Sequence, residues 1–255
     1  MSSSNVILLY DIPGNVAGKA WSPNTWKTRY ALNYKGLPYK TIWVEYPDIA
    51  QVCKEIGATP TSTKEDGSPY FTLPAIYDPS TNTALSESAR IARYLDKTYP
   101  GTPVLIPPET DAFHAAFQEA LQRLVLQNIS PLMLPPTCLQ LNPPSYVYFR
   151  ETRERMYGKK LEEFTPVGPI RDEHWQKVQD GYSRMSSWLT ADGKDKLFFM
   201  GDKICYADIS IAGWTVWMKL VLGPDSAEWA AIKAWDGGRW SRFMEHFEKY
   251  EFVDE

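Results

Sequence analysis

The stretch that decides the fold is Trp21-Ser-Pro-Asn-Thr-Trp-Lys27, which follows an apolar run and a loop containing proline and glycine. The apolar run, residues 6–10, is typical of a buried strand. Ser22 has the side chain of a helix N-cap, and proline at the next position suits the first helical residue. The sequence therefore predicts a helix that begins just after Ser22 and ends near Gly36.

Working outward from this stretch, the first 99 residues alternate between strand and helix patterns. Strands are expected at 6–10, 39–45, 73–78 and 83–85, and helices at 22–35, 48–56 and from 86–88 onward. Pro74 lies near the start of the third strand, and Ser86 is expected to cap the last helix. Residues 58–72 are expected to form a polar loop. The predicted order is βαβαββα.

Strand patterns almost vanish after residue 99. A proline-rich linker is expected at 100–109, followed by an all-helical domain at 110–255. Helical periodicity is present at 111–129, 143–157, 171–189, 206–222 and from about 226. Prolines at 131, 135 and 136 are expected to break or kink the chain between the first two of these helices. The fold class is thus α/β followed by all-α, in two domains.

Composition limits the function. The 255 residues carry a net charge of −4, which argues against a nucleic-acid partner, and aromatic side chains reach 14%. No apolar run approaches the roughly 18 residues of a membrane span, and residues 1–5 lack a basic secretory leader. Three separated cysteines fit a reducing compartment and give no metal-ligand spacing. We expect a cytoplasmic protein with no membrane or metal partner.

Three motifs together resemble the cytosolic glutathione transferases over nearly the whole chain. They are Ser22-Pro-Asn-Thr-Trp-Lys-Thr-Arg-Tyr-Ala-Leu32, Leu73-Pro74 followed by Leu85-Ser-Glu-Ser-Ala-Arg-Ile-Ala-Arg-Tyr-Leu95, and Gly201-Asp-Lys-Ile-Cys-Tyr-Ala-Asp-Ile209. The first motif is most similar to the bacterial β-etherase branch and its fungal relatives, the fungal-specific class A transferases. The resemblance implies a thioredoxin-like N-terminal domain, a homodimer and glutathione as co-substrate.

One residue departs from the family pattern. Cys205 stands where the third motif usually has Ser or Thr, whose hydroxyl caps a buried helix in partnership with Asp208. Sulfur is a weak hydrogen-bond acceptor, so the cap is expected to be weaker here.

Ser22 is the predicted catalytic residue. A free thiol near pKa 8.5 is only about 3% thiolate at pH 7, and lowering that pKa by two units requires about 2.7 kcal/mol. A helix N-terminus contributes up to about 2 kcal/mol, and a hydroxyl hydrogen bond to the thiolate adds roughly 1.5–3 kcal/mol. Asn24 is the reserve candidate for the contact. Serine cannot form a mixed disulfide, which argues against thiol-transfer chemistry.

The resemblance also implies how the rest of glutathione is bound. Pro74 is expected to be cis, which exposes the backbone of Leu73 for strand-like pairing with the cysteinyl part. Glu87 and Ser88, at a helix start, would bind the γ-glutamyl ammonium and carboxylate. The glycyl carboxylate would be bound by one of three lysines, among which the sequence does not choose: Lys40, Lys54 and Lys64.

A second, hydrophobic substrate is expected between the domains. The candidates are Trp21, Phe113 and Phe117, with Met133 or Tyr148 as further possibilities, although single aromatic residues are more often core. The charged run 150–155 is interpreted as a solvated helix face. We expect an enzyme that transfers glutathione to aromatic electrophiles, by conjugation or aryl-ether cleavage. The alternatives are a ligandin-type carrier of phenolic compounds and, least favoured, a regulatory protein on the same fold.

Overall fold

The computed structural model describes residues 6–254, so the polar N-terminal stretch on which the expectation of no leader rests lies outside it. The N-terminal elements are β1 (Ile7–Asp11), α1 (Pro23–Lys35), β2 (Tyr39–Trp43), the 3-10 turn η1 (Tyr46–Asp48), α2 (Ile49–Glu55), β3 (Ser62–Thr63), β4 (Pro69–Tyr70), β5 (Ala75–Asp78), β6 (Thr83–Ser86) and α3 (Ser88–Thr98). The predicted βαβαββα order is present. A small β3–β4 hairpin is added within the expected polar loop.

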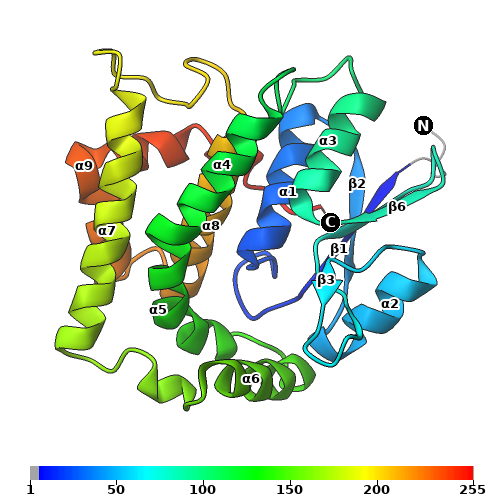
Figure 1. Ribbon diagram of the computed structural model, residues 1–255, viewed down its shortest axis with the longest axis horizontal. Coiled ribbons are helices and arrows are strands. Elements are labelled where there is room, and N and C mark those ends of the chain that lie inside the picture. The colour runs from blue at the N-terminus through cyan, green and yellow to red at the C-terminus, as the bar shows by residue number, and fades with distance from the viewer. Residues whose placement is uncertain (1–5, 255) are drawn as a thin grey trace.

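The main sheet has the strand order β2-β1-β5-β6, with β1 and β2 parallel and the remaining pairs antiparallel. Helices α1 and α3 cover one face of this sheet, while α2 lies on the other side (Figure 1). This arrangement brings the loop after β1, the start of α1 and the start of β5 to one end of the sheet. The thioredoxin-like expectation for the N-terminal domain is confirmed.

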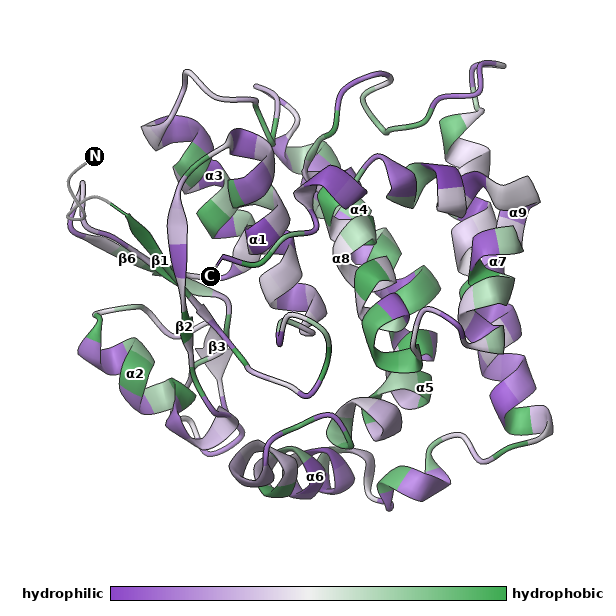
Figure 2. Cartoon of the chain, turned by 180° about the vertical axis from the view of Figure 1, so that it is seen from behind, coloured by the Kyte–Doolittle hydropathy of each residue, from purple (hydrophilic) through white to green (hydrophobic). Residues whose placement is uncertain are grey.

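The named elements of the second half are all helices or helical turns within the described residues. They are α4 (Asp111–Leu121), the π-helical segment η2 (Gln122–Leu126), α5 (Gln127–Cys138), α6 (Pro143–Tyr157), the 3-10 turn η3 (Leu161–Glu163), α7 (Pro169–Leu189), α8 (Tyr206–Leu222), α9 (Ala227–Glu245) and the 3-10 turn η4 (Glu248–Tyr250). The hydrophobic residues of α8 run through the centre of the molecule (Figure 2), and its Trp214 and Trp217 are buried as core.

The expected break at the prolines is wrong, because α5 continues through all three of them. The π-helical segment η2 directly precedes α5, so the irregularity lies upstream of the prolines. Pro135 has no N–H for the carbonyl of Pro131, and the hydroxyl of Thr165 donates to that carbonyl instead at 3.2 Å. Compensation from a distant loop therefore lets the helix persist.

The two halves meet most closely where α1 crosses α8. A Cβ atom on Gly213 would lie 2.9 Å from the carbonyl oxygen of Pro23 and 3.0 Å from Cγ of Lys27. Only glycine allows the two helices to approach this closely. The crossing fixes the N-terminal turn of α1 against the helical domain.

A buried ion pair anchors α1 from the opposite side. Arg29 donates to the carboxylate of Asp11 at 2.8 Å, and both side chains are fully buried. The residues after η4 return to this point: Asp254 pairs with Arg29 and accepts the backbone N–H of Thr41 at 2.6 Å. The end of the described chain thus lies against α1 and β2, far in sequence from either.

Candidate active site

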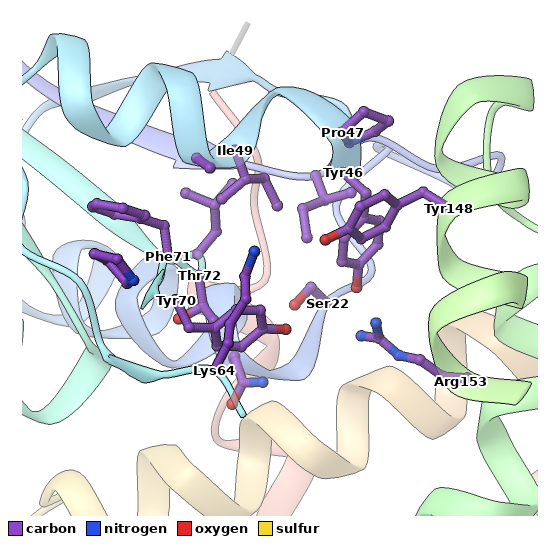
Figure 3. Close-up of a pocket in the computed structure, with 15 residues that line it drawn as sticks. Ser22, Tyr46, Pro47, Ile49, Lys64, Tyr70, Phe71, Thr72, Tyr148 and Arg153 are labelled. Carbon is purple, nitrogen blue, oxygen red and sulfur yellow. The ribbon is translucent and has the colours of Figure 1, made fainter. Parts of the chain in front are cut away.

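A cavity lies beside the start of α1, between the two domains (Figure 3). Its walls come from the N-terminus of α1, the η1–α2 segment, the chain from β4 to the start of β5, and one face of α6. The lining residues are Ile12, Ser22, Asn24, Tyr46, Pro47, Ile49, Ala50, Lys64, Pro69, Tyr70, Phe71, Thr72, Leu73, Tyr148 and Arg153.

Ser22 occupies the predicted N-cap position but does not cap the helix with its side chain. Its carbonyl accepts the Trp26 N–H at 2.9 Å and the Thr25 hydroxyl at 3.0 Å, while its hydroxyl makes no bond to the helix N–H groups. The first turn of α1 carries no acidic residue. The positive end of the helix and an uncommitted hydroxyl therefore face the same cavity. Asn24 also lines it.

The Leu73–Pro74 peptide bond is cis, as the resemblance implied. Leu73 lines the cavity, and Pro74 accepts the backbone N–H of Glu87 at 3.4 Å. This bond holds the start of α3 next to the cis peptide. The predicted site residues Leu73, Pro74 and Glu87 therefore lie close together at one end of the sheet.

The helix α3 is capped differently from the prediction. Ser86 pairs with Ala75 inside the sheet, and its hydroxyl is buried and does not accept an N–H group of α3. Glu87 is the N-cap, with its carboxylate accepting the N–H groups of Ala89 at 2.9 Å and Arg90 at 3.1 Å. The strand extends one residue further than expected, which moves the cap along by one.

Glu87 and Ser88 line a second hollow between α1, α3, α4 and α8. Lys27 reaches the same hollow from α1, where burial lowers its pKa from 10.5 to about 8 against the opposing pull of Glu87. The Tyr206 hydroxyl donates to the Ser88 hydroxyl at 2.9 Å. Lys27 is not among the residues predicted for the site, although the sequence places it one turn after Pro23.

The predicted hydrophobic-site residues do not line the cavity. Trp21 is buried behind its wall, edge-on to Phe149 at 6.5 Å between ring centroids. Phe117 is core, packed on Phe199 at 4.7 Å, and Phe113 is 45% exposed on the outer face of α4. Helical periodicity indicated that both phenylalanines lie on α4 but not which neighbour each face meets.

The aromatic wall is instead formed by Tyr46 and Tyr148, which stack at 5.8 Å with an interplanar angle of 14°. Burial raises the pKa of Tyr46 to about 12, with Arg153 opposing the rise, so this phenol is a neutral hydrogen-bond donor at neutral pH. Met133 is fully buried elsewhere in the core. Of the two further possibilities, only Tyr148 lines the cavity.

The interpretation of residues 150–155 as a solvated helix face is wrong for Arg153, which packs on two aromatic rings. Its guanidinium carbon lies 4.4 Å from the ring centroid of Phe149 and 5.3 Å from that of Tyr46. The face of α6 that carries it is turned toward the N-terminal domain. Nothing in the local charge pattern distinguishes this arginine from its solvated neighbours.

A polar latch holds α6 in this position. Glu45 accepts the side-chain amide of Asn142 at 2.7 Å and the hydroxyl of Ser145, and Ser145 in turn accepts the N–H of Tyr46 at 2.8 Å. The loop before α1 adds a backbone bond, from the N–H of Asn15 to the carbonyl of Gln140 at 2.6 Å. The cavity is therefore built across a fixed domain boundary.

Comparison with known families agrees with this geometry. Residues 21–98 match the glutathione S-transferase N-terminal domain and residues 112–250 the glutathione S-transferase C-terminal domain. The chain belongs to the glutathione S-transferase family. A curated relative, the glutathione S-transferase-like protein ustS of Aspergillus flavus, is 32% identical over 82% of this chain and 78% of its own.

Solved glutathione transferases share the fold over almost the full length. One from Ceriporiopsis subvermispora, in complex with glutathione, is 60% identical, covers 98% of this chain and 100% of its own, and has a TM-score of 0.96. Transferase GSTFuA3 of Phanerochaete chrysosporium is 45% identical over 99% and 100% of the two chains, with a TM-score of 0.93.

One of the three candidate lysines for the glycyl carboxylate lies at the cavity. Within the described residues, only Lys64 lines it, whereas Lys54 lies over Phe71 and Lys40 is exposed on β2.

Between residues 6 and 254, no cluster of three or more His, Cys, Asp or Glu side chains is arranged to hold a metal ion. The helices in that range include none with the length and apolarity of a membrane span.

Proposed function

We propose that this transferase binds glutathione with its thiol at Ser22 and transfers it to aromatic electrophiles. The observation that carries the proposal is the Ser22 hydroxyl, which faces the cavity at the open N-terminus of α1 without capping the helix. Two solved relatives, 60% and 51% identical, are complexes with glutathione, which supports the same co-substrate here.

The chemistry follows from the two groups at the thiol. The helix N-terminus and the Ser22 hydroxyl together stabilise a thiolate by more than the roughly 2.7 kcal/mol that a two-unit fall in pKa requires. The thiolate then attacks an electrophilic carbon, forming a carbon–sulfur bond, and the leaving group departs with the bonding electron pair. A halide or an aryl oxide satisfies this balance, so conjugation and aryl-ether cleavage are the same substitution. Asn24 remains the alternative thiol contact.

The remaining contacts distribute the charges of glutathione. The Leu73 backbone would pair with the cysteinyl residue, and Lys64 is the lysine whose position suits the glycyl carboxylate. Glu87 would bind the γ-glutamyl ammonium, while Ser88 at the N-terminus of α3 would bind its carboxylate. Lys27 adds a buried cation close to that carboxylate.

We assign the aromatic electrophile to the wall formed by Tyr46 and Tyr148 rather than to Phe113 and Phe117. Membership of the fungal-specific class A, related to the β-etherases, is supported by the Ser22–Lys27 motif and by two relatives designated GSTFuA. A cytoplasmic homodimer is the corresponding expectation for location and assembly.

The test is product analysis with purified protein. Incubation with glutathione and either a chlorodinitrobenzene or a β-aryl ether should yield the glutathione adduct by mass spectrometry. A crystal with glutathione should place the sulfur beside Ser22. Absence of glutathione binding by calorimetry would refute the proposal.

A ligandin-type carrier is the second candidate, favoured by the stacked tyrosine pair at the cavity wall. Negligible turnover combined with micromolar binding of aromatic compounds would support the carrier. Turnover that is lost in Ser22→Ala, with aromatic binding retained, would support the enzyme.

A further inference from the structure

The charge of the cavity is one-sided. Its lining includes the cations Lys64 and Arg153, and none of the lining side chains in the described range is a carboxylate. Figure 3 shows Lys64 and Ser22 reaching the cavity from the N-terminal domain and Arg153 reaching it from α6 on the other side. A bound glycyl carboxylate would neutralise one cation and leave the other available.

Neither cavity cation has an ion-pair partner among residues 6–254, and Arg153 is the one that lies on α6, opposite Ser22. Its neighbour Arg150 pairs with Glu154 at 2.9 Å and Glu162 at 2.8 Å. Within residues 6–254, Arg153 forms no ion pair, and its one side-chain hydrogen bond goes to the Thr152 hydroxyl at 2.9 Å. It is half-buried, so the uncompensated charge carries part of a desolvation cost that a bound anion would offset.

The guanidinium is also held in place. Phe149 and Tyr46 contact it, and the latch from Glu45 to Ser145 fixes α6 against the segment that carries Tyr46. Stacking of this kind leaves the edge N–H groups of an arginine free for a planar acceptor. A carboxylate matches that edge with two parallel hydrogen bonds.

We propose that Arg153 binds a carboxylate on the second substrate, so that the site selects flat aromatic acids over neutral aromatics. The ring would lie against Tyr46 and Tyr148, its acid group on Arg153, and its electrophilic carbon toward the thiol at Ser22. This inference rests on the proposed function, because it names the substrate class of the same cavity.

The experiment compares a matched pair of ligands, naphthoic acid and naphthamide, by calorimetry at saturating glutathione. A charge-assisted hydrogen bond in place of a neutral one predicts that the acid binds about tenfold or more tightly. Arg153→Gln should reduce this ratio to near one. Arg153→Lys, which keeps the charge but loses the planar fork, should give an intermediate ratio.

Arg155→Gln is the matched control, because Arg155 lies on the same helix, is exposed and carries the same charge. It should keep the wild-type ratio. An equal loss in Arg155→Gln would reduce the effect to long-range charge and overturn the proposal. So would an unchanged ratio in an Arg153→Gln protein that melts like the wild type, or a weakened affinity for glutathione in place of the acid.

Failure of the inference is separable from failure of the proposed function. Conjugation of glutathione to neutral chlorodinitrobenzene tests the function without involving an acid group. Turnover of that substrate with an acid-to-amide ratio of one would leave the transferase standing and refute the role of Arg153. Absence of turnover would refute the enzyme, while the binding ratio would still report on the cavity.

Discussion

Ser22→Ala is the most informative substitution, because the structure separates two roles that a serine at a helix start usually combines. An N-cap serine typically contributes about 1 kcal/mol to stability. Here the hydroxyl makes no capping bond, so its removal should lower the free energy of unfolding by well under that amount. Its loss should appear instead in the thiol of bound glutathione.

The size of that loss follows from the bond removed. A hydroxyl hydrogen bond to a charged acceptor contributes roughly 1.5–3 kcal/mol, which corresponds to a rise of about one to two units in the thiol pKa. At pH 7 a thiol whose pKa rises from about 6.5 to about 7.5–8.5 falls from about 76% thiolate to about 24–3%, so the conjugation rate should fall roughly threefold to twenty-five-fold.

The assay is a pH titration of ultraviolet thiolate absorbance in the glutathione complex, with thermal unfolding measured in parallel. Asn24→Ala is the comparison, since Asn24 lies at the same helix end. A pKa shift in that variant alone would assign the contact to Asn24. An unchanged pKa in both variants, or a large loss of stability in Ser22→Ala, would refute the reasoning.

Three further predictions concern neighbouring elements. Cys205→Ser should raise the unfolding free energy by about 0.5–1 kcal/mol, seen as a higher melting temperature, because a hydroxyl replaces sulfur in the capping box at the start of α8; a lower melting temperature would contradict this. Glu45→Ala should weaken aromatic binding severalfold in calorimetry while glutathione affinity stays within about twofold, because the latch positions Tyr148 and Arg153 rather than the thiol site; equal losses for both ligands would count against it. Lys27→Met should stabilise the protein by up to about 3 kcal/mol below pH 8. Burial lowers the pKa of Lys27 from 10.5 to about 8 in the folded protein, so the unfolded chain binds the lysine proton more tightly and protonation favours unfolding. The advantage over wild type in denaturant titrations should shrink as pH rises from about 8 toward 10.5, and parallel stability curves would exclude this origin.

Local signals were sufficient for most of the fold. Ser22 with Pro23, Gly36 after α1 and Ser226 before α9 mark helix ends by their own backbone and side-chain chemistry, and each end lies where it was expected. The cis bond before Pro74 was predicted from the family resemblance alone, because only about 5% of peptide bonds before proline are cis in folded proteins.

Apart from the cap of α3, which a strand one residue longer than expected moved to Glu87, the misses arise from contact between distant segments. Thr165 donates to the carbonyl of Pro131, 34 residues away, and Glu45 binds Ser145 across 100 residues. Periodicity identifies the apolar face of a helix but not the surface opposite it. Phe113 was therefore assigned to the pocket, although it is exposed and does not line the cavity. Arg153 was interpreted as solvated, although it lines the cavity.

The return of the chain end to the N-terminal domain has a practical consequence. Asp254 accepts the N–H of Thr41 on β2, Asn33 of α1 donates to the carbonyls of Tyr250 and Phe252, and Tyr30 donates to Glu251. An affinity tag attached just after this segment would emerge from a polar network beside the buried Arg29, not from a free tail. Cleavage near Glu251 would therefore loosen the helix that presents Ser22.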